Sequence, residues 1–219
     1  KKRFWIFEMD DSQAKNKARL YPTIAVSDLF NAATHMYAAY LTAPSWNAST
    51  KRLSFGSEAF IGFGLVAVAA LVGTFRFGCS ESLFARANDD LAHLAAFVGL
   101  PLVGVAFAAK GELFALSCQE TSLFIIICAV VAACARSLSD DAAELLKILF
   151  NVALFLGPVL AYGVLTSDYI TMGAAILFAV AGVAVGADRH RYLLGVRREN
   201  LFHYMIGTAS ALMGQGLIK

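Results

Sequence analysis

The sequence predicts an all-α integral membrane protein built as a bundle of seven transmembrane helices. Of its 219 residues, 58% are hydrophobic and only 16% are charged, which is too apolar for a water-soluble domain of this size. The apolar residues form runs of about 20 residues, the length that crosses a bilayer as a helix. The basic residues are unevenly divided between alternate connections, as expected when Lys and Arg set the orientation of a polytopic protein.

Seven runs are long enough to be spans. The first of them is the most polar, and the fourth carries Gln119 and Glu120 in its first half. Pro101 and Pro158 lie inside the third and fifth runs, where each removes a backbone hydrogen bond and is expected to kink its helix. The predicted spans are 22–43, 55–75, 88–109, 113–135, 142–165, 168–187 and 199–218.

The predicted organisation is one interfacial segment followed by one membrane domain. Residues 1–21 mix basic and aromatic side chains and read as a segment lying on the membrane surface, and residues 22–218 form the seven-helix domain. Counted over the segments outside the spans, 13 Lys and Arg lie on the side of the N-terminus and four on the other. This bias predicts an N-terminus on the cytoplasmic side and a C-terminus on the opposite side. The sequon at Asn47 falls on that opposite side.

Polar residues inside the spans form a candidate site. Asp28, Asn31 and His35 are spaced three and four residues apart, so they share one face of a helix. Asp90 and His93 share a face of the third span. Asp28 and His93, like the acid and imidazole at the start of the seventh span, are predicted near the cytoplasmic side, with His35 deeper. One polar cluster on that side is possible.

Such a cluster has three interpretations. Its members can satisfy one another and hold the helices together, with Asp28 paired to an arginine and His35 bonded to a backbone carbonyl. They can bind a metal, because His and carboxylate groups are good zinc ligands. They can also line a proton or ion path, since charge at membrane depth is costly and is often functional.

Two segments resemble a known family. Asp28-x-x-Asn31-x-x-Thr34-His35 is similar to the acid-x-x-Asn-x-x-Thr/Ser-His stretch that opens the membrane domain of PAQR receptors and hemolysin III proteins. The segment 199–203, Glu-Asn-Leu-Phe-His, resembles the His-x-x-Phe-His of their seventh helix. With the alkaline ceramidases, these proteins form the CREST superfamily.

This resemblance implies a seven-span fold and a zinc ion, held by three histidines, that hydrolyses a lipid amide. It also implies catalytic roles for Asp28 and for Asp89, which lies where the family's third helix carries an aspartate. Only His203 remains of the three histidine ligands, because Glu199 replaces one and the second-helix histidine has no counterpart. Either the catalytic function is lost, or a zinc site in this chain uses another set, with His203, Glu199 and His93 as its expected ligands and Asp89 beside them.

The sequence thus leaves three functions open. The first is a non-catalytic membrane protein (an accessory subunit, scaffold or receptor-like bundle), favoured by short connections and the incomplete histidine triad. The second is a zinc-dependent lipid amide hydrolase of the CREST type, and the third is a small transporter or proton-conducting bundle that uses Asp28 and His35. Membrane lipids and other membrane subunits are the expected partners. The net charge of +2 gives no basis for nucleic-acid binding.

Two further expectations concern small residues. The four cysteines form no CxxC pair and are expected to be small buried hydrophobic residues. Gly182 and Gly186 form a G-x-x-x-G pair in the sixth span, a spacing that lets two helix backbones approach closely.

Overall fold

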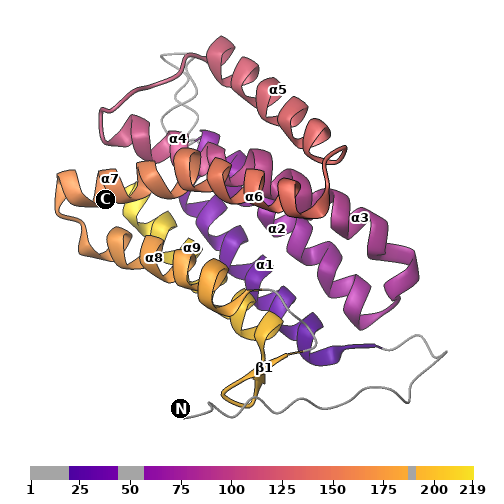
Figure 1. The fold of residues 1–219 in the computed structure, drawn as a ribbon. Helices are drawn as coiled ribbons and strands as arrows, with labels where there is room; N and C mark the ends of the chain where they lie inside the picture. Colours follow the sequence, from indigo (N-terminus) through magenta and orange to yellow (C-terminus); the bar gives the residue numbers. More distant parts are fainter. Residues whose placement is uncertain (1–19, 44–56, 187–190) are drawn as a thin grey trace, which may run out of the picture.

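The computed structural model describes residues 20–43, 57–186 and 191–219. Seven helical rods account for most of these residues, and a short β-hairpin precedes the last rod (Figure 1). The hairpin pairs β1 (Tyr192–Leu193) with β2 (Val196–Arg197). The rods are α1 (Pro22–Thr42), α2 (Ser57–Gly78), α3 (Glu81–Leu94) continued by η1 (Ala95–Gly99) and α4 (Leu100–Lys110), α5 (Cys118–Ala135), α6 (Asp140–Asn151) continued by η2 (Val152–Leu156) and α7 (Gly157–Thr166), α8 (Tyr169–Val180) continued by η3 (Ala181–Val185), and α9 (Arg198–Ile218).

The predicted helical bundle is confirmed, with one rod for each predicted run. Four rods are long and apolar enough to cross a membrane, namely α2, α3–α4, α5 and α6–α7. The rod α8–η3 is apolar but shorter. Neither α1 nor α9 is among the four, because their polar side chains lower their mean hydropathy.

The third and fourth rods begin at other residues than the predicted spans, and capping explains both differences. The third rod begins at Glu81 because the Ser80 side chain caps it, accepting a hydrogen bond from the Leu83 backbone N–H. Its first turns are polar and extend beyond the apolar run on which the prediction rested. The fourth rod begins at Cys118, since Ser117 and Glu120 form a capping box that fixes the first turn there.

The two prolines inside the rods coincide with changes in helix type. The π-helical turn η1 lies directly before Leu100 and Pro101, and η2 lies directly before Gly157 and Pro158. A proline has no N–H for the i→i−4 bond, and its ring clashes with the carbonyl four residues back. A wider turn before each proline accommodates both effects, and a π-helical turn therefore lies at each position where a kink was expected.

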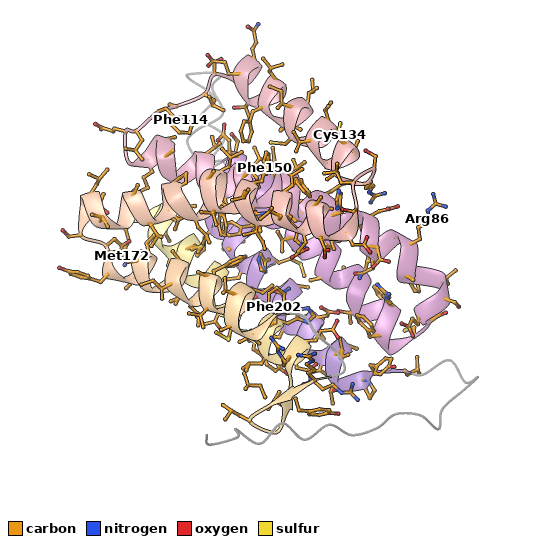
Figure 2. The ribbon with its side chains drawn as sticks, in the orientation of Figure 1. Arg86, Phe114, Cys134, Phe150, Met172 and Phe202 are labelled. Carbon is orange, nitrogen blue, oxygen red and sulfur yellow. The ribbon has the colours of Figure 1, made fainter. Side chains whose placement is uncertain are left out.

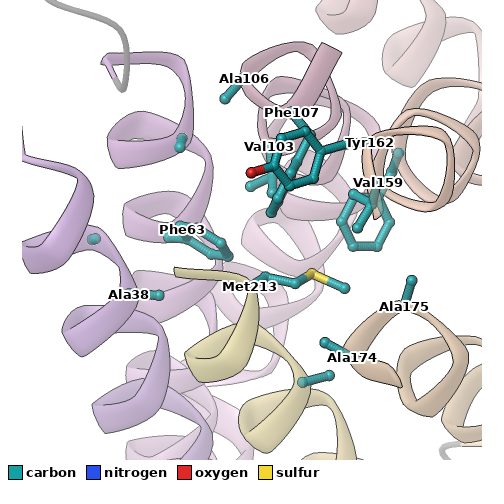
Figure 3. Packing of buried hydrophobic residues seen from close by; sticks show 14 residues of the cluster. Ala38, Phe63, Val103, Ala106, Phe107, Val159, Tyr162, Ala174, Ala175 and Met213 are labelled. Atoms are coloured by element: carbon teal, nitrogen blue, oxygen red, sulfur yellow. The ribbon is translucent and has the colours of Figure 1, made fainter. Parts of the chain in front are cut away.

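The largest apolar core lies where α1, α2, α4, α7, α8 and α9 meet. Phe63, Phe107 and Val103 pack there with Val159 and Met213 (Figure 3). The α3–α4 rod is central, and α4 contacts both α2 and α7. By contrast, α5 lies at the edge of the bundle (Figure 1) and buries only three of its residues.

The expectations about small residues were mostly wrong. Only Cys128 is buried, and the other three cysteines are exposed; Cys134 lies near the end of α5 (Figure 2). A side chain added at Gly182 would meet no atom within 4 Å, so this glycine makes no close helix contact. Gly186 instead ends its rod with a φ of +65°. The Asn47 sequon and all but the last two residues of the predicted interfacial segment lie outside the described residues.

Candidate functional site

The candidate site is a row of polar side chains between the first and last helices. We call it the α1–α9 seam, and it consists of Ser27, Asp28, Asn31 and His35 from α1 with Asn200, His203 and Ser210 from α9. Because a helix repeats every 3.6 residues, the spacing of the α1 members places them on one stripe. Two glycines bring α9 close, since a Cβ at Gly207 would overlap Thr34 and one at Gly214 would lie 2.8 Å from the Ala38 Cα.

Asp28 and His203 form the centre of the seam. The Asp28 Oδ1 atom lies 3.0 Å from His203 Nδ1, and the side chains are only 6% and 12% exposed. The Ser27 Oγ atom lies 3.2 Å from the same nitrogen and donates to the Ile24 carbonyl at 2.9 Å. A serine–histidine–aspartate triad needs one ring nitrogen for the serine and the other for the acid. Here both face one nitrogen, so this arrangement cannot relay a proton between them.

The other oxygen of Asp28 rests against α2. An added Cβ at Gly73 would lie 2.5 Å from Asp28 Oδ2 and 3.1 Å from Asn88 Oδ1. The missing side chain at Gly73 is therefore what lets the carboxylate pack against the α2 backbone and face α3. Asp28 thus joins α1 to α9 through His203 and packs against α2 at Gly73.

His35 lies deeper in the seam and is fully buried. Its Nδ1 is 2.9 Å from the Asn31 backbone carbonyl, and its Nε2 is 2.8 Å from the Ser210 hydroxyl. The contact of Nδ1 confirms the predicted bond to a backbone carbonyl. Both ring nitrogens have a hydrogen-bond partner. Among the described residues, the Asn31 Oδ1 atom is buried without a hydrogen-bond partner.

Arg76 joins α2 to acidic residues of α3. Its guanidinium lies 2.6 Å from Asp89 Oδ1 and 4.0 Å from Glu81, and it stands over the Phe77 ring. Arg76 thus neutralises Asp89, and Asp28 pairs with His203 rather than with the expected arginine. The Asp89 side chain is 67% exposed, which places it at the rim of the bundle rather than in a closed site.

The remaining predicted site residues belong to a second contact, between α3 and α5. Asp90 pairs with Arg136 at 2.6 Å, and the His93 Nε2 atom lies 2.7 Å from the Ala132 backbone carbonyl. Both interactions turn away from the α1–α9 seam. The single polar cluster expected from the sequence is therefore divided, because Asp90 and His93 face α5.

The predicted zinc ligands are not brought together. Within residues 20–43, 57–186 and 191–219, no group of three or more His, Cys, Asp or Glu side chains could hold a metal ion. His203 faces Asp28 and His93 faces α5, while Glu199 is buried at the start of α9. The donors described here do not fit a zinc site made of His203, Glu199 and His93.

Sequence reasoning missed two members of the seam, Ser27 and Ser210, and its support Gly73. The signal for Ser210 is its position seven residues after His203, which places both on one helix face. Nothing in the sequence marks Gly73, because its role depends on how α1 packs on α2.

Comparison with known proteins gives no match to a family model, to a curated protein or to a solved structure. The resemblance to the CREST superfamily therefore stays a prediction.

Proposed function

We propose that this chain is a seven-span, non-catalytic membrane protein, an accessory or receptor-like bundle held together by the α1–α9 seam. The observation that carries the proposal is the inverted polarity of α1. Its polar members Ser27, Asp28, Asn31 and His35 are buried, whereas its exposed side chains include Val26, Leu29, Met36 and Tyr40.

A helix on the surface of a water-soluble protein has the opposite arrangement, with apolar residues facing the core and polar residues facing water. The α1 arrangement is favourable in lipid, where exposed apolar side chains cost nothing and polar groups must find partners inside the protein. The helix α9 also buries polar residues, Asn200 and Ser210, on the side that meets α1. Both helices then count as spans although their mean hydropathy is modest.

We propose a non-catalytic protein because the side chains that could react already have hydrogen-bond partners within the bundle. Asp28 and His203 bond each other, both nitrogens of His35 are occupied, and His93 bonds a backbone carbonyl. Polar side chains commonly hold membrane helices together in this way.

A proton or ion path fits the seam less well. Beyond His35 and Ser210, the α1–α9 contact continues through Ala38 and Gly214, and Met213 belongs to the same apolar core. The polar groups of the seam therefore end part of the way along the helix pair.

The partners that fit this proposal are lipids and neighbouring membrane subunits. The helix α5 exposes Leu123, Ile126, Ile127 and Val130 on its outer surface. Such a face is stable only when acyl chains or another apolar protein surface cover it.

The experiment that tests the proposal is metal analysis of the protein purified in mild detergent without chelator. We expect no stoichiometric zinc, and an unfolding temperature that a chelator leaves unchanged. A content of about one zinc per chain, the stoichiometry of a catalytic site, that is lost in His203→Ala would overturn the non-catalytic proposal.

A second experiment tests the spans, using the native cysteines. In variants that keep one cysteine each, an impermeant maleimide added to sealed cells should label Cys118, at the start of α5, on the outer side. Cys79 directly follows α2 and Cys134 lies near the end of α5, both on the side opposite to the start of α5. They should therefore react only after permeabilisation. The buried Cys128 is the matched control and should react under neither condition. Labelling of Cys118 and Cys134 from one side would contradict a spanning α5.

A further inference from the structure

The β-hairpin before α9 presents an apolar tip to the outside of the protein. Leu193 pairs with Val196 across a two-residue loop formed by Leu194 and Gly195. Leu194 is 93% exposed, and the paired residues Leu193 and Val196 are 39% and 40% exposed. In Figure 1 the hairpin lies beyond the end of α8, beside the start of α1.

The loop chemistry is unusual for a hairpin in water. Leu194 and Gly195 have φ values of +54° and +80°, the pattern of a type I′ turn, whose first position is normally Asn, Asp or Gly. A leucine in this left-handed conformation is rare. The chain thus places a large apolar side chain where a small polar one would be favoured by both backbone and solvent, which points to a role for the side chain itself.

The base of the hairpin is fixed to the bundle. The Arg197 guanidinium lies 5.3 Å from the Tyr21 ring and 5.4 Å from the Tyr192 ring. The Arg198 side chain donates to the Val185 and Ala184 carbonyls at the end of η3. The tip is therefore held in one direction relative to the helices.

The surroundings of the tip have the composition of a membrane interface. Tyrosine and arginine are enriched at the level of lipid headgroups, with apolar side chains directly below them. Tyr21, Tyr192 and Arg197 form such a group at the hairpin base. The nearby η3 turn exposes Val183 by 86%, so the apolar tip is close to a surface that also favours acyl chains.

We propose that the hairpin is a membrane-interface anchor, whose leucine tip inserts among the acyl chains of the leaflet on the N-terminal side. Its partner is the lipid surface, with phosphate headgroups beside the arginines at its base. This inference rests on the proposed function, because it requires a chain that spans the membrane.

The test is tryptophan fluorescence of the full chain in nanodiscs. The two native tryptophans, Trp5 and Trp46, are replaced by phenylalanine, and Leu194→Trp provides the reporter. We expect a blue-shifted emission, strong quenching by lipids brominated just below the headgroups, and weak quenching by aqueous iodide. Val196→Trp is a second reporter, so that one misfolded variant does not decide the result.

Ile126→Trp, in the middle of α5, separates the two proposals. If lipids brominated deep in the acyl chain quench this residue while no brominated lipid quenches Leu194→Trp or Val196→Trp, the anchor is wrong and the membrane proposal stands. Strong quenching of the tip reporters by iodide would show that the hairpin lies in water, which overturns the anchor. Protection from both quenchers would show a tip covered by residues 1–19 or by another protein, and this result also overturns the anchor. If none of the three reporters is quenched by lipid, the membrane proposal itself fails.

Discussion

Gly104 shows how much depends on a single small residue. It lies on α4 where the central rod meets the π-helical turn η2. A Cβ added at Gly104 would overlap the Leu154 carbonyl and lie 2.8 Å from the Phe155 Cα. These neighbours are backbone atoms, which cannot rotate away as a side chain can.

Gly104→Ala should therefore destabilise the protein although alanine favours helix. Overpacking of this kind typically costs about 1–3 kcal/mol, and we expect a lower unfolding temperature in detergent. The matched control is Gly64→Ala, because an added Cβ at Gly64 meets no atom within 4 Å. Equal unfolding temperatures for Gly104→Ala and the unmodified protein would show that α4 and η2 are not in this contact.

The Asp28–His203 pair makes a prediction at the same scale. Asp28→Ala or His203→Ala leaves the other group buried without its partner, which costs about 3–5 kcal/mol for a buried pair. The double variant should be destabilised by less than the sum of the two single changes. Thermal unfolding of the four proteins in one detergent measures this coupling.

Asp90→Ala is the control for this experiment. The Asp90 and Arg136 side chains are 43% and 50% exposed, and an exposed pair is worth about 0–1 kcal/mol. If loss of Asp90 destabilises the protein as much as loss of Asp28, burial is not the reason why the Asp28–His203 pair stabilises the protein.

Among the helices, α9 depends on an interaction made at its end. Lys110, the last residue of α4, donates from Nζ to the Gly216 and Leu217 carbonyls at 3.0 and 2.8 Å. The last carbonyls of a helix have no partner within the helix and carry partial negative charge. The lysine satisfies two of them and joins α4 to α9.

Lys110→Met should loosen the end of α9, since a hydrogen bond to a charged group contributes about 1.5–3 kcal/mol. We expect faster amide hydrogen exchange in the last two turns of α9 and a lower unfolding temperature. Lys219→Met is the comparison, because Lys219 lies 3.9 Å from Asp168 and its side chain is 51% exposed. If both variants exchange at the same rate as the unmodified chain, Lys110 does not stabilise α9.

The elements were predictable to the extent that they depend on local chemistry. Apolar length predicted the seven rods, and the prolines predicted the irregular turns at η1 and η2. The starts of α3 and α5 were missed because serine caps at Ser80 and Ser117 fix them. A search for apolar runs does not detect a capping residue.

At the scale of the whole molecule, the sequence predicted which residues form polar stripes but not which stripes meet. Asp28 and His35 were identified on one face of α1, and the structure places that face against α9. Asp90 and His93, three residues apart, also share one helix face, yet they face α5. The difference depends on the rotation of α3 in the bundle, which is set by packing among several helices.

The proposed function requires that α1 and α9 cross the membrane, with their polar faces meeting in the seam. The most direct measurement is the sidedness of cysteines placed at their ends in a cysteine-free chain. Leu20→Cys lies at the start of α1, Ala43→Cys at its end, and Lys219→Cys at the end of α9. Our account predicts that an impermeant maleimide reaches Ala43→Cys and Lys219→Cys from one side and Leu20→Cys only from the other. Labelling of all three positions from the same side would contradict it.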